Sequence, residues 1–179
     1  MMSEQSKQGI AAAFQRAARA GLIRAPGDSC TIVPAQESEV GAQAAETLHL
    51  ITISSFVFRL LTIFHLADSA ATRAYFVGGT AGQSLDEGFA EIANLCCGAL
   101  NRELARHFSH LAMSIPYTLS RHCIAFLEAL QPQYRSSYAI TINDSVQLQV
   151  TLCMSCQVPL ELAASPAEVE HGGGELEIF

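Results

Sequence analysis

Apolar residues recur along this chain with two spacings, and each spacing predicts a kind of secondary structure. Over residues 8–22 they recur every three or four positions, which predicts an amphipathic helix. β-Branched and aromatic residues dominate residues 48–66, which predicts two strands, although no Gly, Pro, Asn or Asp locates their turn. Residues 138–142 and 146–152 alternate apolar with polar positions around an Asn-Asp pair, which predicts a β-hairpin.

Shorter elements are indicated by capping residues and by residues that end helices and strands. Three are predicted in this way: a strand over residues 30–33 ended by Pro34, a helix from Asp68-Ser69 to Phe76 ended by Gly78-Gly79, and a helix over residues 120–130 capped by Ser120. Residues 36–46 are small and polar, which is typical of a connector or a weak helix.

The clearest element begins at Ser84, which is followed three residues later by Glu87 in the pattern of a capping box. We expect this helix to run to about His110. One side of it is apolar and consists of Leu85, Phe89, Ile92, Cys96, Leu100, Leu104, Phe108 and Leu111. The opposite side consists of Glu87, Glu91, Asn94, Gly98, Arg102 and Ala105. Because the apolar side must face a core, the second set is predicted to face solvent.

Composition indicates a single globular domain. The 179 residues are 50% hydrophobic and 15% charged, which is too apolar for intrinsic disorder and suits one domain with a core. The predicted helices and strands together indicate the α/β (α+β) class. We expect residues 1–162 to form this domain. Residues 163–179 contain three consecutive glycines and are predicted to be a flexible C-terminal tail.

Charge and hydropathy exclude two classes of partner. Acidic residues outnumber basic ones by 17 to 10, for a net charge of −7, and no run of Lys or Arg is present, so we expect no nucleic-acid partner. The most apolar stretch, residues 51–66, contains Arg59 and His65 and is shorter than the ~20 residues that span a bilayer. The N-terminus lacks the apolar block of a signal peptide. We therefore expect no membrane partner and a cytoplasmic location.

One motif points to a family. Residues 91–98, Glu-Ile-Ala-Asn-Leu-Cys-Cys-Gly, resemble the Glu-x-x-Asn-x-x-x-Gly helix motif of the CheC/CheX/FliY response-regulator phosphatases. The motif occurs once, as in CheX-like members. The resemblance implies an antiparallel sheet with long helices packed on it. We also expect a homodimer, formed through sheet or helix edges.

The same resemblance implies an activity, the hydrolysis of phosphoaspartate on CheY-like receiver domains. Asn94 would orient the attacking water, and Glu91 would pair with the receiver's active-site lysine. Glu87, Gly98 and Arg102 would contact the partner. Phosphoryl transfer needs positioning and charge compensation more than covalent help. The receiver would supply Mg²⁺, and the chain would need no cofactor of its own.

Other interpretations of this helix stay open. On periodicity alone, Glu91 and Asn94 solvate an exposed face, and Gly98 relieves crowding against a neighbouring helix. A domain of this fold also suits a receiver-binding adaptor or a flagellar-switch-like interaction module that does not catalyse hydrolysis.

A redox or metal function would use other residues. Cys153 and Cys156 form a lone Cys-x-x-Cys within a strand pattern, so buried thiols are favoured over a redox pair. His107 and His110 have a spacing that can bind a metal ion, but no third ligand is visible at a suitable spacing.

Overall fold

The computed structural model describes residues 2–35, 47–78 and 82–162. Its elements in chain order are α1 (Glu4–Leu22), β1 (Cys30–Ala35), β2 (Thr47–Ser54), β3 (Phe58–Leu66), α2 (Ala70–Phe76), α3 (Leu85–Ala105), β4 (Ala112–Met113), β5 (Tyr117–Ser120), the 3₁₀ helix η2 (Arg121–Leu130), β6 (Tyr134–Ile142) and β7 (Val146–Cys156). The strands form one antiparallel sheet in the order β1-β6-β7-β3-β2-β4, and β5 also pairs with β2.

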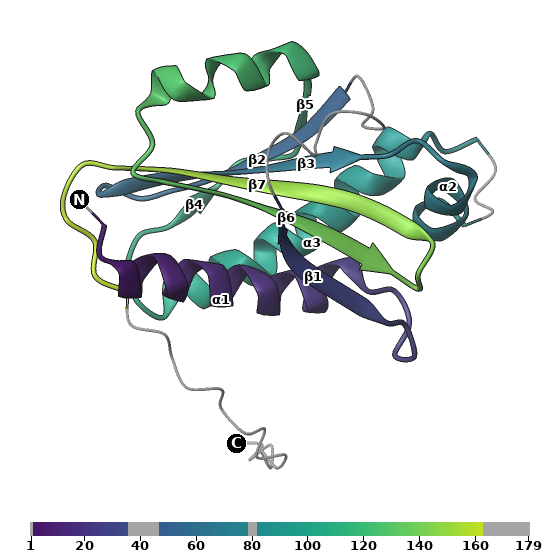
Figure 1. Ribbon diagram of the computed structural model, residues 1–179, viewed down its shortest axis with the longest axis horizontal. Coiled ribbons are helices and arrows are strands. Elements are labelled where there is room, and N and C mark those ends of the chain that lie inside the picture. Colours follow the sequence, from purple (N-terminus) through teal and green to yellow (C-terminus); the bar gives the residue numbers. More distant parts are fainter. Residues whose placement is uncertain (1, 36–46, 79–81, 163–179) are drawn as a thin grey trace, which may run out of the picture.

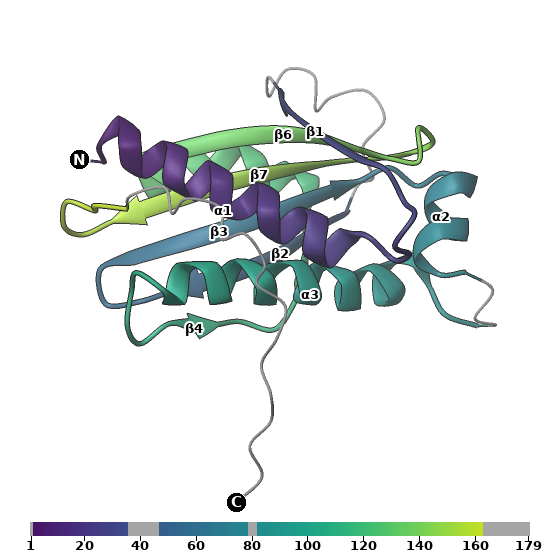
Figure 2. The same ribbon diagram turned by 90° about the horizontal axis from the view of Figure 1, so that it is seen from below.

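The helices cover both faces of this sheet. α1 and α3 lie side by side across one face, and η2 lies over the other (Figures 1 and 2). The α+β class and the antiparallel sheet with packed helices are therefore confirmed. No helix within the described ranges is long and apolar enough to span a bilayer.

Local turn chemistry sets the two hairpins at the centre of the sheet. Asn143 and Asp144 have φ angles of 48° and 56°, the left-handed pair of a two-residue hairpin turn, so the predicted hairpin is confirmed. The β2–β3 turn depends on Ser55, whose hydroxyl oxygen accepts a hydrogen bond from the Val57 N–H at 3.1 Å. A serine can thus supply the turn where Gly, Pro, Asn and Asp are missing.

The main core lies between the sheet and the pair α1 and α3. Alternate side chains of β7 point into it, and all four that the pattern predicted to share a face are buried: Val146, Leu148, Val150 and Leu152. Phe89 of α3 packs edge-on against Phe64 of β3 and Phe76 of α2, with ring centroids 5.6 Å and 5.0 Å apart. These contacts fix the apolar side of α3 against the sheet.

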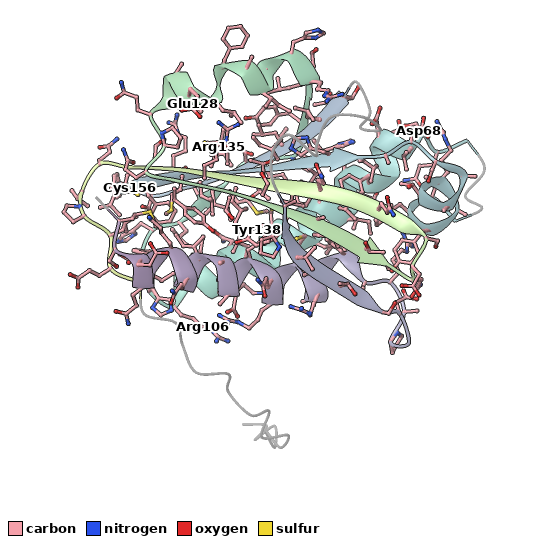
Figure 3. All side chains as sticks on the ribbon, viewed as in Figure 1. Asp68, Arg106, Glu128, Arg135, Tyr138 and Cys156 are labelled. Carbon is pink, nitrogen blue, oxygen red and sulfur yellow. The ribbon has the colours of Figure 1, made fainter. Side chains whose placement is uncertain are left out.

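The second face of the sheet carries a smaller apolar cluster beneath η2, which includes Leu61 of β3, Leu127 of η2 and Cys153 of β7. Glu128 of η2 accepts a hydrogen bond from Arg135 of β6, and the two side chains point toward one another (Figure 3). The ion pair and the apolar cluster together hold η2 on this face.

A buried polar chain lies on the same face. His65 Nε2 is 3.1 Å from Thr151 Oγ1, which is 3.0 Å from Ser137 Oγ. The His65 side chain is only 3% exposed. Burial, together with the positive charge of Arg121, lowers the pKa of His65 from 6.5 to about 4. The folded protein therefore holds this ring neutral well below pH 6.

Acidification is expected to destabilise the fold through His65. The unfolded chain binds a proton at this residue below pH 6.5 and the folded chain does so only near pH 4, so the free energy of unfolding falls as the pH drops through that window. Between pH 7 and pH 5 the loss due to His65 is about 2 kcal/mol. Urea unfolding of wild type and His65→Gln at both pH values measures this loss, because the variant has no imidazole at this position and should not show it.

The control for this experiment is His107→Gln, since His107 is exposed. It should keep the wild-type difference in stability between the two pH values. If wild type and His65→Gln lose the same stability on acidification, the assignment to His65 is wrong.

Several predicted boundaries differ in the structure. β1 does not end at Pro34 but continues to Ala35, because an edge strand tolerates a residue without an N–H. α3 ends at Ala105, so the predicted end near His110 is wrong. After the helix the chain turns, with His110 at φ 57°, and Phe108 packs on Phe58 of β3 with ring centroids 4.9 Å apart.

The predicted helix after Ser120 forms, and the Ser120 side chain caps it, although its hydrogen bonding is of the 3₁₀ type. β4 and β5 were not predicted. The connector at residues 36–46 and the tail at residues 163–179 lie outside the described residues, so those predictions and the domain boundary at residue 162 stay predictions.

Candidate functional site

The N-terminal end of α3 is built as the sequence predicts. The Ser84 hydroxyl accepts a hydrogen bond from the Glu87 N–H at 3.2 Å, and Glu87 Oε2 accepts one from the Ser84 N–H at 3.0 Å. The capping box is therefore confirmed. Hydrogen bonds from Ser84 lower the pKa of Glu87. The Glu87 carboxylate is thus held at the start of α3 while its side chain remains exposed.

Two polar contacts fix the position of α3 near its ends. His49 of β2 is buried, and its Nε2 lies 3.0 Å from Asp86 Oδ1. Burial lowers the pKa of His49 against the opposing effect of Asp86, so at neutral pH an uncharged ring donates from Nε2 to that carboxylate. At the other end, Arg16 Nε of α1 donates to Glu103 Oε2 at 2.8 Å. Any side chain on the outer surface of α3 is therefore presented by a fixed helix.

The inner side of α3 is buried as predicted. Leu85, Phe89, Ile92, Cys96, Leu100 and Leu104 are each at most 8% exposed. Phe108 and Leu111, which the prediction placed on the same stripe, lie beyond the end of the helix and pack partly buried against the core. The stripe therefore faces the core over the whole length of α3.

The outer side of α3 brings the predicted site residues together. Glu91, Asn94 and Arg102 are exposed, and Gly98 is half-buried. Within the described chain neither Glu91 nor Asn94 has a hydrogen-bond or ion-pair partner. Residues three apart on a helix are neighbours on its surface. A carboxylate and an amide thus stand side by side, both available to a second molecule.

Gly98 has no packing role in the described structure. A Cβ built on it would meet only the Arg102 guanidinium, with Nη1 at 3.7 Å. The interpretation that Gly98 relieves crowding against a neighbouring helix is therefore wrong. A glycine inside a helix costs about 1 kcal/mol relative to alanine, and nothing in the described fold compensates. The helix backbone is left bare one turn beyond Asn94.

Leu95 belongs to the same surface and was not singled out in the sequence. It is 60% exposed and follows Asn94 directly. A helical wheel places it four residues after Glu91 and three before Gly98, between charged and small residues. An apolar residue at a polar position of the wheel is the signal that identifies it.

The residues of the alternative redox and metal sites are not positioned for those functions. Cys153 packs in the cluster under η2, whereas Cys156 packs against the main core, so the two thiols lie on opposite faces of β7 and do not face each other. His107 and His110 follow the end of α3 and no longer have helical spacing. In the described part of the chain no three His, Cys, Asp or Glu side chains converge as metal ligands.

Comparison with solved structures shows a known fold. The chain aligns with chemotaxis protein CheX from Vibrio vulnificus with a TM-score of 0.53 and 14% identity, covering 86% of this chain and 100% of that one. A CheC-like superfamily protein from Shewanella sp. PV-4 gives a TM-score of 0.52 and 8% identity, covering 86% and 99%. The CheX-CheY-BeF₃-Mg²⁺ complex from Borrelia burgdorferi gives 0.51 and 11%, covering 82% and 96%.

Sequence comparisons add no further relative. No protein-family model matches the chain, and no curated protein matches it. At identities of 8–14% the likeness is one of fold. The chain therefore has the CheX/CheC-like fold that the motif at residues 91–98 implies.

Proposed function

We propose that this chain accelerates hydrolysis of the phosphoaspartate of a CheY-like receiver domain in chemotaxis or two-component signalling. The observation that carries the proposal is the outer surface of α3, where Glu91 and Asn94 stand exposed, without partners among the described residues, beside Gly98. The fold supports a receiver as the partner, because a structure of this fold from Borrelia burgdorferi is a CheX-CheY-BeF₃-Mg²⁺ complex.

Asn94 is the proposed positioning group for water. In the reaction a water oxygen attacks phosphorus, the bond from phosphorus to the aspartate oxygen breaks, and a carboxylate and inorganic phosphate are released. Such a reaction depends on an in-line water and on charge compensation. A side-chain amide donates and accepts hydrogen bonds at once, so Asn94 can hold the water without competing as a nucleophile. The receiver supplies Mg²⁺ for charge compensation.

Glu91 is the proposed docking group. Its carboxylate lies one helical turn from Asn94 and is free to pair with the lysine of the receiver's active site. That ion pair would set the register in which Asn94 meets the phosphoryl group. We define the docking face as Glu87, Glu91, Asn94, Gly98 and Arg102, which follow one another along the outer side of α3.

The direct test measures phosphate release from several phosphorylated CheY-like receivers, with and without this protein. Faster release from at least one receiver supports the proposal. Binding to the phosphorylated receiver with no change in phosphate lifetime would instead assign the chain the adaptor role. If the protein binds none of the receivers and accelerates phosphate release from none of them, both functions are rejected.

Glu91→Ala is expected to weaken receiver binding by about 1–3 kcal/mol, because it removes one partner of an interfacial ion pair. This corresponds to a roughly 5- to 150-fold higher Kd. Titration of a receiver activated with beryllium fluoride and Mg²⁺ measures the change. Glu161→Ala removes an exposed carboxylate elsewhere and should leave the Kd unchanged. Equal affinity of Glu91→Ala and wild type would show that the docking role is wrong.

The homodimer and the cytoplasmic location belong to the same proposal. The chain must share a compartment with the receiver that it dephosphorylates, and a dimer is compatible with catalysis only if it leaves the docking face open. Sedimentation of the protein alone and with the receiver tests both the dimer and the accessibility of α3.

A further inference from the structure

Leu95 is an exposed large apolar side chain on a helix whose other large apolar residues are buried. It is 60% exposed, whereas Ile92 is 7% exposed and Leu100 is fully buried. An isolated apolar residue on a surface needs no explanation. Leu95 differs because of its neighbours, since it directly follows Asn94 and lies on the helix surface between Glu91 and Gly98.

The surroundings of Leu95 combine three features on one small surface. Glu91 and Asn94 provide polar groups without intrachain partners in the described structure. Gly98 leaves the helix backbone bare, since of the residues that the structure describes only Arg102 lies near the place where its Cβ would be. Interfaces have an apolar centre and a polar rim, so a projecting apolar side chain surrounded by polar groups and exposed backbone fits the centre of a contact.

We propose that Leu95 is the apolar anchor by which α3 docks the receiver. It inserts into an apolar recess beside the phosphorylated aspartate and excludes water around the ion pair of Glu91. Leu95 sets affinity and takes no part in the hydrolysis itself. This inference rests on the proposed function, and its occupant is a folded domain that offers a lysine and an apolar recess near an acyl phosphate.

The position of Leu95 favours this occupant over a second copy of the chain. Leu95 lies between Glu91 and Gly98 on the outer side of α3, so a partner that engages Glu91 and Asn94 also covers Leu95. A second copy seated on Leu95 would instead block the two groups on which the proposed function depends. A partner that supplies a lysine also has the charge complementary to Glu91.

The test replaces Leu95 with glutamine, a polar side chain of comparable volume that keeps a high helix propensity but not the apolar surface. Leu95→Gln is expected to raise the Kd for a receiver activated with beryllium fluoride and Mg²⁺ about tenfold, which is about 1.4 kcal/mol. The rate of phosphate release at saturating protein should not change. Leu95→Met should bind like wild type, because it restores an apolar side chain of similar size.

Phe126→Gln is the matched control. Phe126 is 70% exposed and belongs to η2 on the opposite face of the sheet, so its replacement should leave the Kd unchanged. An unchanged Kd in Leu95→Gln, or an equal loss in Phe126→Gln, would overturn the inference while wild-type acceleration still supported the proposed function. If Leu95→Gln sediments differently from wild type in the absence of a receiver, the inference is also overturned, since Leu95 would then contact a second copy. If wild type neither binds nor accelerates any receiver, both ideas fail together.

Discussion

Replacing Asn94 with alanine is expected to abolish the acceleration of receiver dephosphorylation and to leave the fold and the receiver affinity nearly unchanged. Asn94 is exposed and has no hydrogen-bond partner within the described chain, so its loss leaves no buried group unsatisfied. The catalytic loss should be at least about 100-fold, because misplacing a reacting group by about 1 Å already costs that much. Single-turnover phosphate release at saturating protein measures the rate.

Two further variants make the result specific to the amide. Asn94→Asp keeps the shape of the side chain but places a carboxylate against the phosphoryl oxygens, and it should lose both acceleration and affinity through charge repulsion. Gln147→Ala removes an exposed amide from β7 and should behave like wild type. Full activity in Asn94→Ala would reject the catalytic assignment even if the receiver still bound.

The elements that the sequence predicted correctly have local causes. The capping box at Ser84 and the apolar stripe of α3 depend on residues three or four apart, and both were confirmed. The hairpin at Asn143-Asp144 depends on two residues that tolerate positive φ. The exposure of Glu91 and Asn94 follows from the same stripe, because one buried side of a helix determines which side faces solvent.

The features that were missed depend on residues far apart in the sequence. β4 consists of Ala112 and Met113, which are extended because they pair with Ser54 and Ile53 of β2. α3 stops at Ala105, before its apolar pattern ends, since Phe108 packs on β3 instead. The role of Gly98 could not be predicted from the sequence either, because only its neighbours in the folded structure show whether a glycine relieves crowding or leaves the backbone bare.

Gly21→Ala is expected to be the most destabilising of the substitutions considered, at about 3 kcal/mol, because it overpacks the contact between α1 and α3. A Cβ at Gly21 would lie 2.3 Å from Cys96 Cα and 2.5 Å from Cys96 N. Both atoms belong to the backbone, so no side chain can rotate away and the two helices must separate. The higher helix propensity of alanine returns only about 1 kcal/mol. Urea unfolding measures the net change.

Gly98→Ala makes the same chemical change on α3, but it is expected to raise the stability of the fold instead of lowering it. Its Cβ would enter open space beside Arg102, so the free energy of unfolding should rise by up to about 1 kcal/mol. Receiver affinity should fall nonetheless, because the methyl group blocks the close approach that the bare backbone allows. Destabilisation by both substitutions would contradict the packing described for Gly98. A Gly98→Ala variant that is more stable and binds as well as wild type would show that the glycine does not serve docking.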